Sequence, residues 1–183
     1  RRSMFVHLSR ELARAERLKS EVAIIVMDID GFKEINDTCG HNVGDHALRE
    51  VAGALQGALR PYDLCVRYAG DEFIVVLTDC SREKADAKRH ELQAKISEIE
   101  VEVRGGKRLR LGVSAGAAVF PHDGSTYEEL LADADHLMYR DKAARRGHAT
   151  ISTHAPHGDF ISSEMFDAAV PVGPIAPLPQ TLA

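Results

Sequence analysis

The stretch VAIIVMDIDGFKEINDTCGHNVGDHAL, residues 22–48, decides the fold. It opens with a continuous apolar run, residues 22–27, which predicts a strand buried on both faces. Two aspartates and a glycine follow, and residues 31–38 then predict a short helix that ends at Gly40. Carboxylates at the end of a buried strand, beside a glycine that lets another backbone approach, are suited to divalent metal and phosphate chemistry.

A second stretch, RYAGDEF at residues 67–73, lies between two apolar segments. Residues 63–68 and 73–77 predict the two strands of a hairpin, with a turn of about four residues between them. This turn carries two more carboxylates, Asp71 and Glu72, at the tip of the hairpin.

The rest of the chain alternates between helical and extended patterns. Helical spacing covers residues 3–19, the region from Leu48 to Leu59, and the regions after Ser81 and after Ser125. Paired glycines predict a second hairpin over residues 101–113, whose second strand we expect to continue to Phe120. The central order is strand, helix, strand, strand, helix, strand. This order predicts an α+β protein of the ferredoxin-like (split βαβ) type, with a central mixed or antiparallel sheet flanked by helices. In that arrangement Asp28 and Asp71 meet.

Composition narrows the class of protein. The 183 residues are enough for one domain with a full core, and we expect this domain over residues 1–152 and a proline-rich tail or linker over residues 153–183. A net charge of −5 argues against nucleic acid as a partner. No apolar run is long enough for a membrane span, so we expect no membrane contact by this fragment. Three cysteines without metal-ligand spacing predict reduced thiols and a cytoplasmic protein, or the cytosolic domain of a larger, membrane-anchored one. The first residue is Arg1 rather than Met, which is typical of an excised fragment.

Each candidate residue also has a simpler interpretation. Asp30 is more often the N-cap of the helix that follows, Asp45 is more often an N-cap as well, and Asn36 is more often a helix-end residue. Taken alone, Asp28 is interpreted as a salt-bridge partner. Three basic residues are each more often solvated surface cations: Lys33, Lys142 and Arg146.

The two stretches together resemble the diguanylate cyclase (GGDEF) domain. The resemblance extends over roughly residues 1–152. Two motifs carry it: D-x-D-x-F-K-x-I-N-D-x-x-G-H-x-x-G-D-x-x-L, and then R-Y-A-G-D-E-F. The resemblance implies a nucleotidyl-cyclase or palm-like fold and the condensation of two GTP molecules into cyclic di-GMP with release of pyrophosphate. It also implies two Mg²⁺ (or Mn²⁺) ions per GTP, and a homodimer in which each domain holds one GTP.

The resemblance further implies a role for particular residues. The metal ligands are Asp28, Asp71 and the backbone carbonyl of Ile29, and the catalytic residues are Asp71, Glu72 and Lys33. Asn36 and Asp45 are the guanine readers, and Gly70 lets the hairpin backbone approach the nucleotide. The positions around the phosphates are Phe32, Lys33, Lys142 and Arg146. The RxxD string of Arg60 and Asp63 matches an inhibitory site for cyclic di-GMP, for which the simpler interpretation is a surface ion pair.

The sequence departs from the family pattern in three places, one of which is the absence of the short motif that normally precedes Arg1, as expected of a fragment. Ala69 replaces the first glycine, which gives the variant AGDEF, and Arg145-Arg146-Gly147 replaces the usual Gly-Arg-Asn. These departures favour an alternative function, in which a catalytically weak or inactive domain binds GTP or cyclic di-GMP and regulates a neighbouring domain. The intact carboxylates favour the active enzyme. A third class, a palm-like nucleotidyltransferase acting on nucleic acid, conflicts with the acidic net charge.

Overall fold

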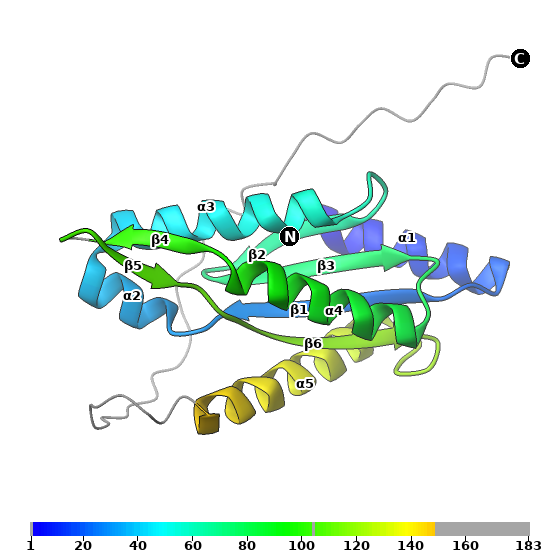
Figure 1. Ribbon diagram of the computed structural model, residues 1–183. Coiled ribbons are helices and arrows are strands. Elements are labelled where there is room, and N and C mark those ends of the chain that lie inside the picture. Colours follow the sequence, from blue (N-terminus) through cyan, green and yellow to red (C-terminus); the bar gives the residue numbers. More distant parts are fainter. Residues whose placement is uncertain (1, 104, 149–183) are drawn as a thin grey trace, which may run out of the picture.

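The computed structural model describes residues 2–103 and 105–148, with side chains described within residues 4–103 and 105–145. The predicted tail over residues 153–183 and the side chain of Arg146 therefore lie outside the described residues. In chain order the elements are α1 (Arg2–Leu18), β1 (Val22–Ile29), α2 (Phe32–Cys39), α3 (His41–Ala58), β2 (Leu64–Ala69), β3 (Glu72–Thr78), α4 (Arg82–Ser97), β4 (Glu100–Val103), β5 (Lys107–Arg110), β6 (Val113–Phe120) and α5 (Tyr127–His148), as drawn in Figure 1.

The central sheet has the strand order β2-β3-β1-β6, and each neighbouring pair is antiparallel. This is the order expected of a split βαβ fold, so the predicted α+β class is confirmed, with an antiparallel rather than a mixed sheet. β1 lies in the middle of the sheet, and its residue Asp28 is the register partner of Glu72 in β3 and of Ser114 in β6. The end of β1 is therefore adjacent to the start of β3.

Helices cover both faces of this sheet (Figure 1). Side chains of β1 alternate between two apolar clusters. Ala23, Ile25 and Met27 pack in a cluster with residues of α2, α3 and α4, whereas Ile24 and Val26 pack in a cluster with residues of α1 and α5. Every residue of β1 is buried, as the continuous apolar run predicts. By the same alternation, Asp28 faces the layer that contains α5.

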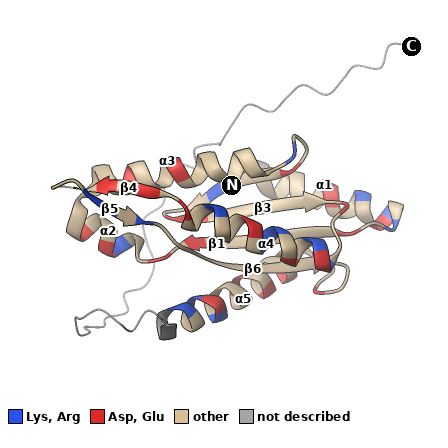
Figure 2. Ribbon diagram, in the orientation of Figure 1, with Lys and Arg blue, Asp and Glu red and all other residues tan. Residues whose placement is uncertain are grey.

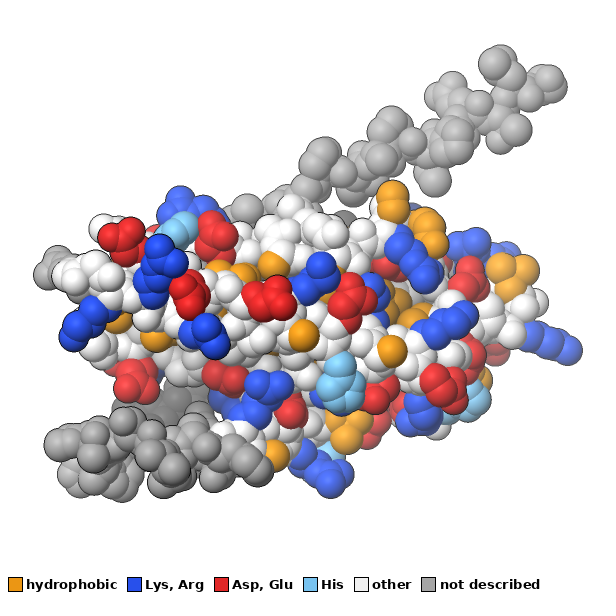
Figure 3. All heavy atoms as spheres, in the orientation of Figure 1, with side chains coloured by type: hydrophobic (Ala, Val, Ile, Leu, Met, Phe, Trp, Pro, Cys, Tyr) orange, Lys and Arg blue, Asp and Glu red, His pale blue; other side chains and the backbone are white. Residues whose placement is uncertain are grey.

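Charge is distributed mainly over the helices and the β4–β5 hairpin, as Figure 2 shows. On the face drawn in Figure 3, acidic and basic side chains are interspersed, without a continuous basic channel of the kind that follows a nucleic-acid backbone. None of the helices in the described part of the chain combines the length and apolar composition that a membrane crossing requires.

The expectation that one strand runs from the second hairpin to Phe120 is wrong. The chain instead forms β5, which pairs with β4, and then β6, which pairs with β1. Between the two strands the Leu111 N–H donates to the Ile99 carbonyl (3.0 Å), and the Gly112 carbonyl accepts from the Asp30 N–H (2.9 Å). The backbone of this link therefore bonds to other parts of the chain, which separates the two sheets.

Two predicted helix caps are also wrong. The residue that precedes α2 is Gly31, not Asp30, and Gly31 has a left-handed backbone (φ 67°) that glycine adopts without strain. The residue that precedes α3 is Gly40, whose carbonyl accepts from the Gly44 N–H (3.3 Å), so Asp45 lies within the helix instead of capping it. The two aspartate side chains are consequently available for other contacts.

Candidate functional site

The first part of the site is the carboxylate at the end of β1. Asp28 is 9% exposed, and its Oδ1 accepts a hydrogen bond from Lys142 Nζ on α5 at 2.5 Å. The simpler interpretation of Asp28 as a salt-bridge partner is therefore confirmed, and the interpretation of Lys142 as a solvated surface cation is wrong. A buried carboxylate requires such a partner, because removing its charge from water is unfavourable. The pair joins α5 to the central strand.

The second part is the tip of the β2–β3 hairpin. Ala69 pairs with Glu72, so the turn consists of Gly70 and Asp71 and is shorter than the four residues expected. Gly70 is the turn residue with a positive φ (40°), whereas Ala69 belongs to the extended strand, where a methyl group is well tolerated. The Ile29 N–H donates to the Asp71 carbonyl at 3.3 Å. The hairpin tip is thus hydrogen-bonded to the end of β1, and the predicted meeting of Asp28 and Asp71 is confirmed.

The electrostatics of Asp71 reflect this neighbourhood. Burial raises the pKa of the Asp71 carboxyl above its ordinary value, and the adjacent Asp28 carboxylate raises it further. The backbone N–H of Asp71, Lys142 and Arg67 act in the opposite direction but do not cancel the increase. A carboxyl whose ionisation is disfavoured by burial and by a neighbouring carboxylate is a site that a cation would stabilise.

Asp30 has a role that the sequence did not indicate. Its Oδ1 accepts from the hydroxyl of the fully buried Ser114 on β6 at 2.5 Å, and its N–H donates to the Gly112 carbonyl. The backbone that follows Asp28 is therefore held on one side by β6 and on the other by the hairpin tip, through Ile29. These contacts fix the direction of the chain where it leaves β1.

The third part is the corner between α2 and α3, where the Asn36 side chain lies against Gly44, the residue that precedes Asp45. Asn36 lies in the last turns of α2, and its side chain is directed at the start of α3, against Gly44. A Cβ atom on Gly44 would lie 2.0 Å from Asn36 Oδ1, so only glycine allows this approach. Asp45, the next residue, is exposed. Of the other residues predicted on α2, Phe32 packs against the core and Lys33 is exposed.

The residues at the end of β1 are compatible with a small divalent cation, although side chains alone do not complete a site. Within the described residues, no group of three or more His, Cys, Asp or Glu side chains is arranged to hold a metal ion. Asp28 and Asp71 offer carboxylate oxygens, which are the ligands that Mg²⁺ prefers, and Mg²⁺ commonly takes only one or two carboxylates together with substrate phosphates and water. The raised pKa of Asp71, which comes first from burial and then from the Asp28 carboxylate, is the observation that favours a cation there.

Arg60 and Asp63 do not form the surface ion pair of the simpler interpretation; they form a turn. The Arg60 N–H donates to Asp63 Oδ2 (3.0 Å), and the Asp63 N–H donates to the Arg60 carbonyl (3.0 Å). The Arg60 guanidinium lies over the ring of Tyr62, 5.8 Å from its centre. Asp63 Oδ1 is buried and has no hydrogen-bond partner within the described structure. A buried carboxylate oxygen without a donor is unusual and is the kind of polar group that often marks a functional position.

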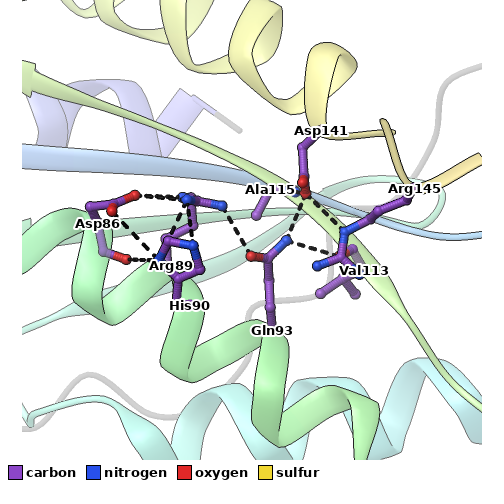
Figure 4. A network of polar contacts seen from close by, with 8 residues as sticks. All are labelled: Asp86, Arg89, His90, Gln93, Val113, Ala115, Asp141 and Arg145. Carbon is purple, nitrogen blue, oxygen red and sulfur yellow. Dashed lines mark hydrogen bonds and ion pairs between the residues drawn. The ribbon is translucent and has the colours of Figure 1, made fainter. Parts of the chain in front are cut away.

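A polar network between α4, β6 and α5 was not foreseen (Figure 4). Gln93 Nε2 donates to Asp141 Oδ2 (2.7 Å), and the Ala115 N–H donates to the same oxygen (3.0 Å). Gln93 and Asp141 are 48 residues apart, and neither belongs to a recognisable motif, so no pattern in the sequence could have paired them.

Comparisons with known proteins agree with this geometry. The family described as diguanylate cyclase, GGDEF domain, matches residues 1–148. Diguanylate cyclase DosC of Escherichia coli is 37% identical over 147 residues, which are 80% of this chain and 31% of that protein. The chain thus spans about a third of the length of this curated relative.

Solved structures give the same result for the fold. The GGDEF domain of YfiN (also TpbB) from Pseudomonas aeruginosa has a TM-score of 0.74 and 34% identity, and the match covers 79% of this chain and 89% of that one. The GGDEF domain of DgcB from Caulobacter crescentus, solved in complex with cyclic di-GMP, has a TM-score of 0.71 and 28% identity. That match covers 80% of this chain and 85% of the DgcB chain.

Proposed function

Because the chain belongs to the diguanylate cyclase GGDEF domain family, we propose that it condenses two GTP molecules into cyclic di-GMP and releases pyrophosphate. The observation that carries this proposal is the juxtaposition of Asp28 and Asp71 at the junction of β1 and the hairpin, with Lys142 against Asp28. The variant AGDEF is compatible with activity, because the left-handed position of the turn falls on Gly70 and not on Ala69.

The residues that would hold the metal are Asp28, Asp71 and the carbonyl of Ile29. When bound there, two Mg²⁺ or Mn²⁺ ions per GTP would polarise the phosphate oxygens and stabilise the charge of the leaving pyrophosphate. Glu72, next to Asp71 at the start of β3, would act beside this site. Lys142 would place a positive charge next to the triphosphate, while Lys33 and Arg146 would add further charge around the phosphates. Positioning and charge stabilisation account for most of the rate in phosphoryl transfer.

The corner of α2 and α3 would recognise the base. The Asp45 carboxylate can accept hydrogen bonds from the N1–H and N2–H₂ groups of guanine, and the Asn36 amide can serve as donor or acceptor. Adenine offers neither of those two donors, so the corner would favour GTP over ATP. Phe32 would pack near the nucleotide, and Gly70 would let the hairpin backbone approach it.

Each domain would hold one GTP, so a ring of two nucleotides requires two domains that face each other. The product would also bind at Arg60 and Asp63, where Asp63 Oδ1 has no donor within the part of the chain that the structure describes. The Caulobacter DgcB structure contains cyclic di-GMP, which supports the expectation that this family binds its product. Binding at Arg60 and Asp63 would inhibit the enzyme.

The test is to incubate the protein with GTP and Mg²⁺ and to detect cyclic di-GMP by chromatography. We expect product from the parent chain, no product from Asp71→Ala, and an unchanged rate from Asp135→Ala, which removes an exposed carboxylate elsewhere on α5. A parental rate in Asp71→Ala would refute the assignment. Calorimetry distinguishes the remaining case: GTP binding without turnover would indicate a regulatory nucleotide-binding domain instead of a cyclase.

A further inference from the structure

Two consecutive residues of α5, Asp141 and Lys142, are directed at different partners. Lys142 Nζ bonds to Asp28 Oδ1, as described above. Figure 4 shows the carboxylate of Asp141 directed instead at Gln93 of α4 and at the backbone of β6. Successive helical side chains diverge by about 100° around the axis, so a contact made by one residue constrains the direction of the other.

Asp141 is held firmly in this position. Its Oδ2 accepts three hydrogen bonds, from the Ala115 N–H (3.0 Å), Gln93 Nε2 (2.7 Å) and Arg145 Nε (3.1 Å). Burial alone would raise the pKa of this carboxyl, but the Ala115 N–H, Arg145 and Gln93 together outweigh burial and lower it. The ionised form of Asp141 is therefore the form that these contacts favour.

Gln93 extends the contact to α4. It is buried, at 6% exposure, and its Nε2 donates to the Val113 carbonyl (3.2 Å) as well as to Asp141. Its Oε1 accepts from Arg89 Nη1 (3.0 Å), and Arg89 in turn pairs with Asp86 (2.7 Å). The side chain of Gln93 thus bridges α4 and α5 across the outer edge of β6, with each of its polar atoms bonded.

This anchor lies next to the candidate active site. Ala115, which bonds to Asp141, is the register partner of Met27, and the preceding residue of β6, Ser114, is the partner of Asp28. The anchor point of α5 is therefore one residue along the sheet from the carboxylate that Lys142 must reach. A lysine side chain is flexible, so the contact between its ammonium group and Asp28 persists only while α5 stays in a position from which Lys142 can reach that carboxylate.

We propose that Asp141, supported by Gln93, is a positioning residue that fixes the register of α5 on β6 and so holds Lys142 at Asp28. This inference rests on the proposed function for its kinetic consequence, since an effect on kcat/KM can be measured only if the protein is a cyclase. Its structural part, the control of Lys142 by Asp141, is independent of any nucleotide. A role limited to covering the edge of β6 would affect stability but not the environment of Lys142.

The first experiment measures how accessible Lys142 is. The folded protein is treated with an amine-acetylating reagent, and the rate at each lysine is read by mass spectrometry, with the exposed Lys84 of α4 as an internal reference. We expect Asp141→Ala to accelerate acetylation of Lys142 several-fold relative to Lys84, and Asp141→Asn, which keeps an acceptor oxygen, to have a smaller effect. Asp135→Ala is the matched control and should behave as the parent does. An unchanged rate at Lys142 in a folded Asp141→Ala protein would overturn the proposal.

The second experiment is a double-mutant cycle on cyclic di-GMP formation. We expect Lys142→Ala to lower kcat/KM for GTP by about tenfold or more, the size of one charge-assisted hydrogen bond. Asp141→Ala should lower it to a similar extent in the parent and have no further effect in Lys142→Ala. Independent, multiplying effects would overturn the proposal. A parent without cyclase activity would refute the proposed function alone, because the acetylation result would still decide the role of Asp141.

Discussion

Replacement of Gly44 by alanine should separate nucleotide recognition from stability. A Cβ atom at position 44 would lie 2.0 Å from Asn36 Oδ1, whereas ordinary van der Waals contact begins at 3.4 Å, so the amide of Asn36 must move by about 1.4 Å. The obstacle is the end of a flexible side chain, so Asn36 should rotate away without disturbing the backbone. The new alanine lies within helix α3, where it is more favourable than glycine by roughly 0.5–1 kcal/mol.

The same substitution at Gly53 provides the control. Gly53 is in the same helix, and a Cβ atom there meets nothing within 4 Å. We expect both variants to unfold at the same denaturant concentration as the parent or higher. We expect only Gly44→Ala to weaken GTP binding, by about 1 kcal/mol, which is a roughly fivefold increase in Kd and corresponds to one lost hydrogen bond to the base.

Isothermal titration with GTP, with metal present and turnover blocked by a non-reactive analogue, measures both Kd values. Asn36→Ala should weaken binding to a similar extent, and Gly44→Ala should have no further effect in that background. If Gly44→Ala binds GTP as tightly as Gly53→Ala does, Asn36 does not contact the base, and the assignment of the α2–α3 corner as the guanine site is wrong.

Other predictions concern charge, regulation, thiols and assembly. Because the pKa of Asp71 is raised, its ionisation destabilises the metal-free fold at neutral pH but not below about pH 4. In EDTA, Asp71→Asn should therefore raise the unfolding temperature at pH 7 and lose this advantage in acid. An equal gain in unfolding temperature at both pH values would show that the ionisation of Asp71 is not its cause. Arg60→Ala should weaken cyclic di-GMP binding about tenfold or more in a calorimetric titration, and tight binding by this variant would remove Arg60 from the inhibitory site. Burial raises the pKa of Cys65 to about 12, so a thiol reagent at pH 8 should modify the partly exposed Cys39 and leave Cys65 unreacted until the protein unfolds, as peptide mapping would reveal. Specific activity should rise with protein concentration if two domains must meet, and a rate strictly proportional to enzyme over a wide dilution range would argue against this requirement.

Periodic and local features of the fold were predictable from the sequence. The apolar run before Asp28 predicted a strand buried on both faces, because a central strand in a sheet covered by helices has no polar face. The strand order followed from the order of elements, and it brought Asp28 and Asp71 together without any knowledge of side-chain contacts.

Features that depend on a specific backbone angle or on a distant partner were not predictable. Asp30 looked like a helix cap until the structure revealed that Gly31 takes this position and that Asp30 bonds to Ser114, 84 residues away. The pairing of Lys142 with Asp28 spans 114 residues, and nothing in the local sequence of α5 indicates it. The first contact depends on the pairing of β1 with β6 and the second on the packing of α5 on the sheet, and only the assembled tertiary structure determines these.

The outer edge of β6 has a consequence for how two copies of this domain meet. The N–H groups of Ala115 and Val119 face away from the sheet, and they donate to the carboxylates of Asp141 and Asp123 (3.0 and 2.8 Å). An approaching strand from another molecule would have to displace two negatively charged side chains before it could hydrogen-bond to this edge. Proteins that must collide repeatedly, as these domains would in each catalytic cycle, risk joining their sheets and aggregating. Along β6 the carboxylates of Asp141 and Asp123 oppose that outcome, because they already occupy the backbone N–H groups that a second strand would need.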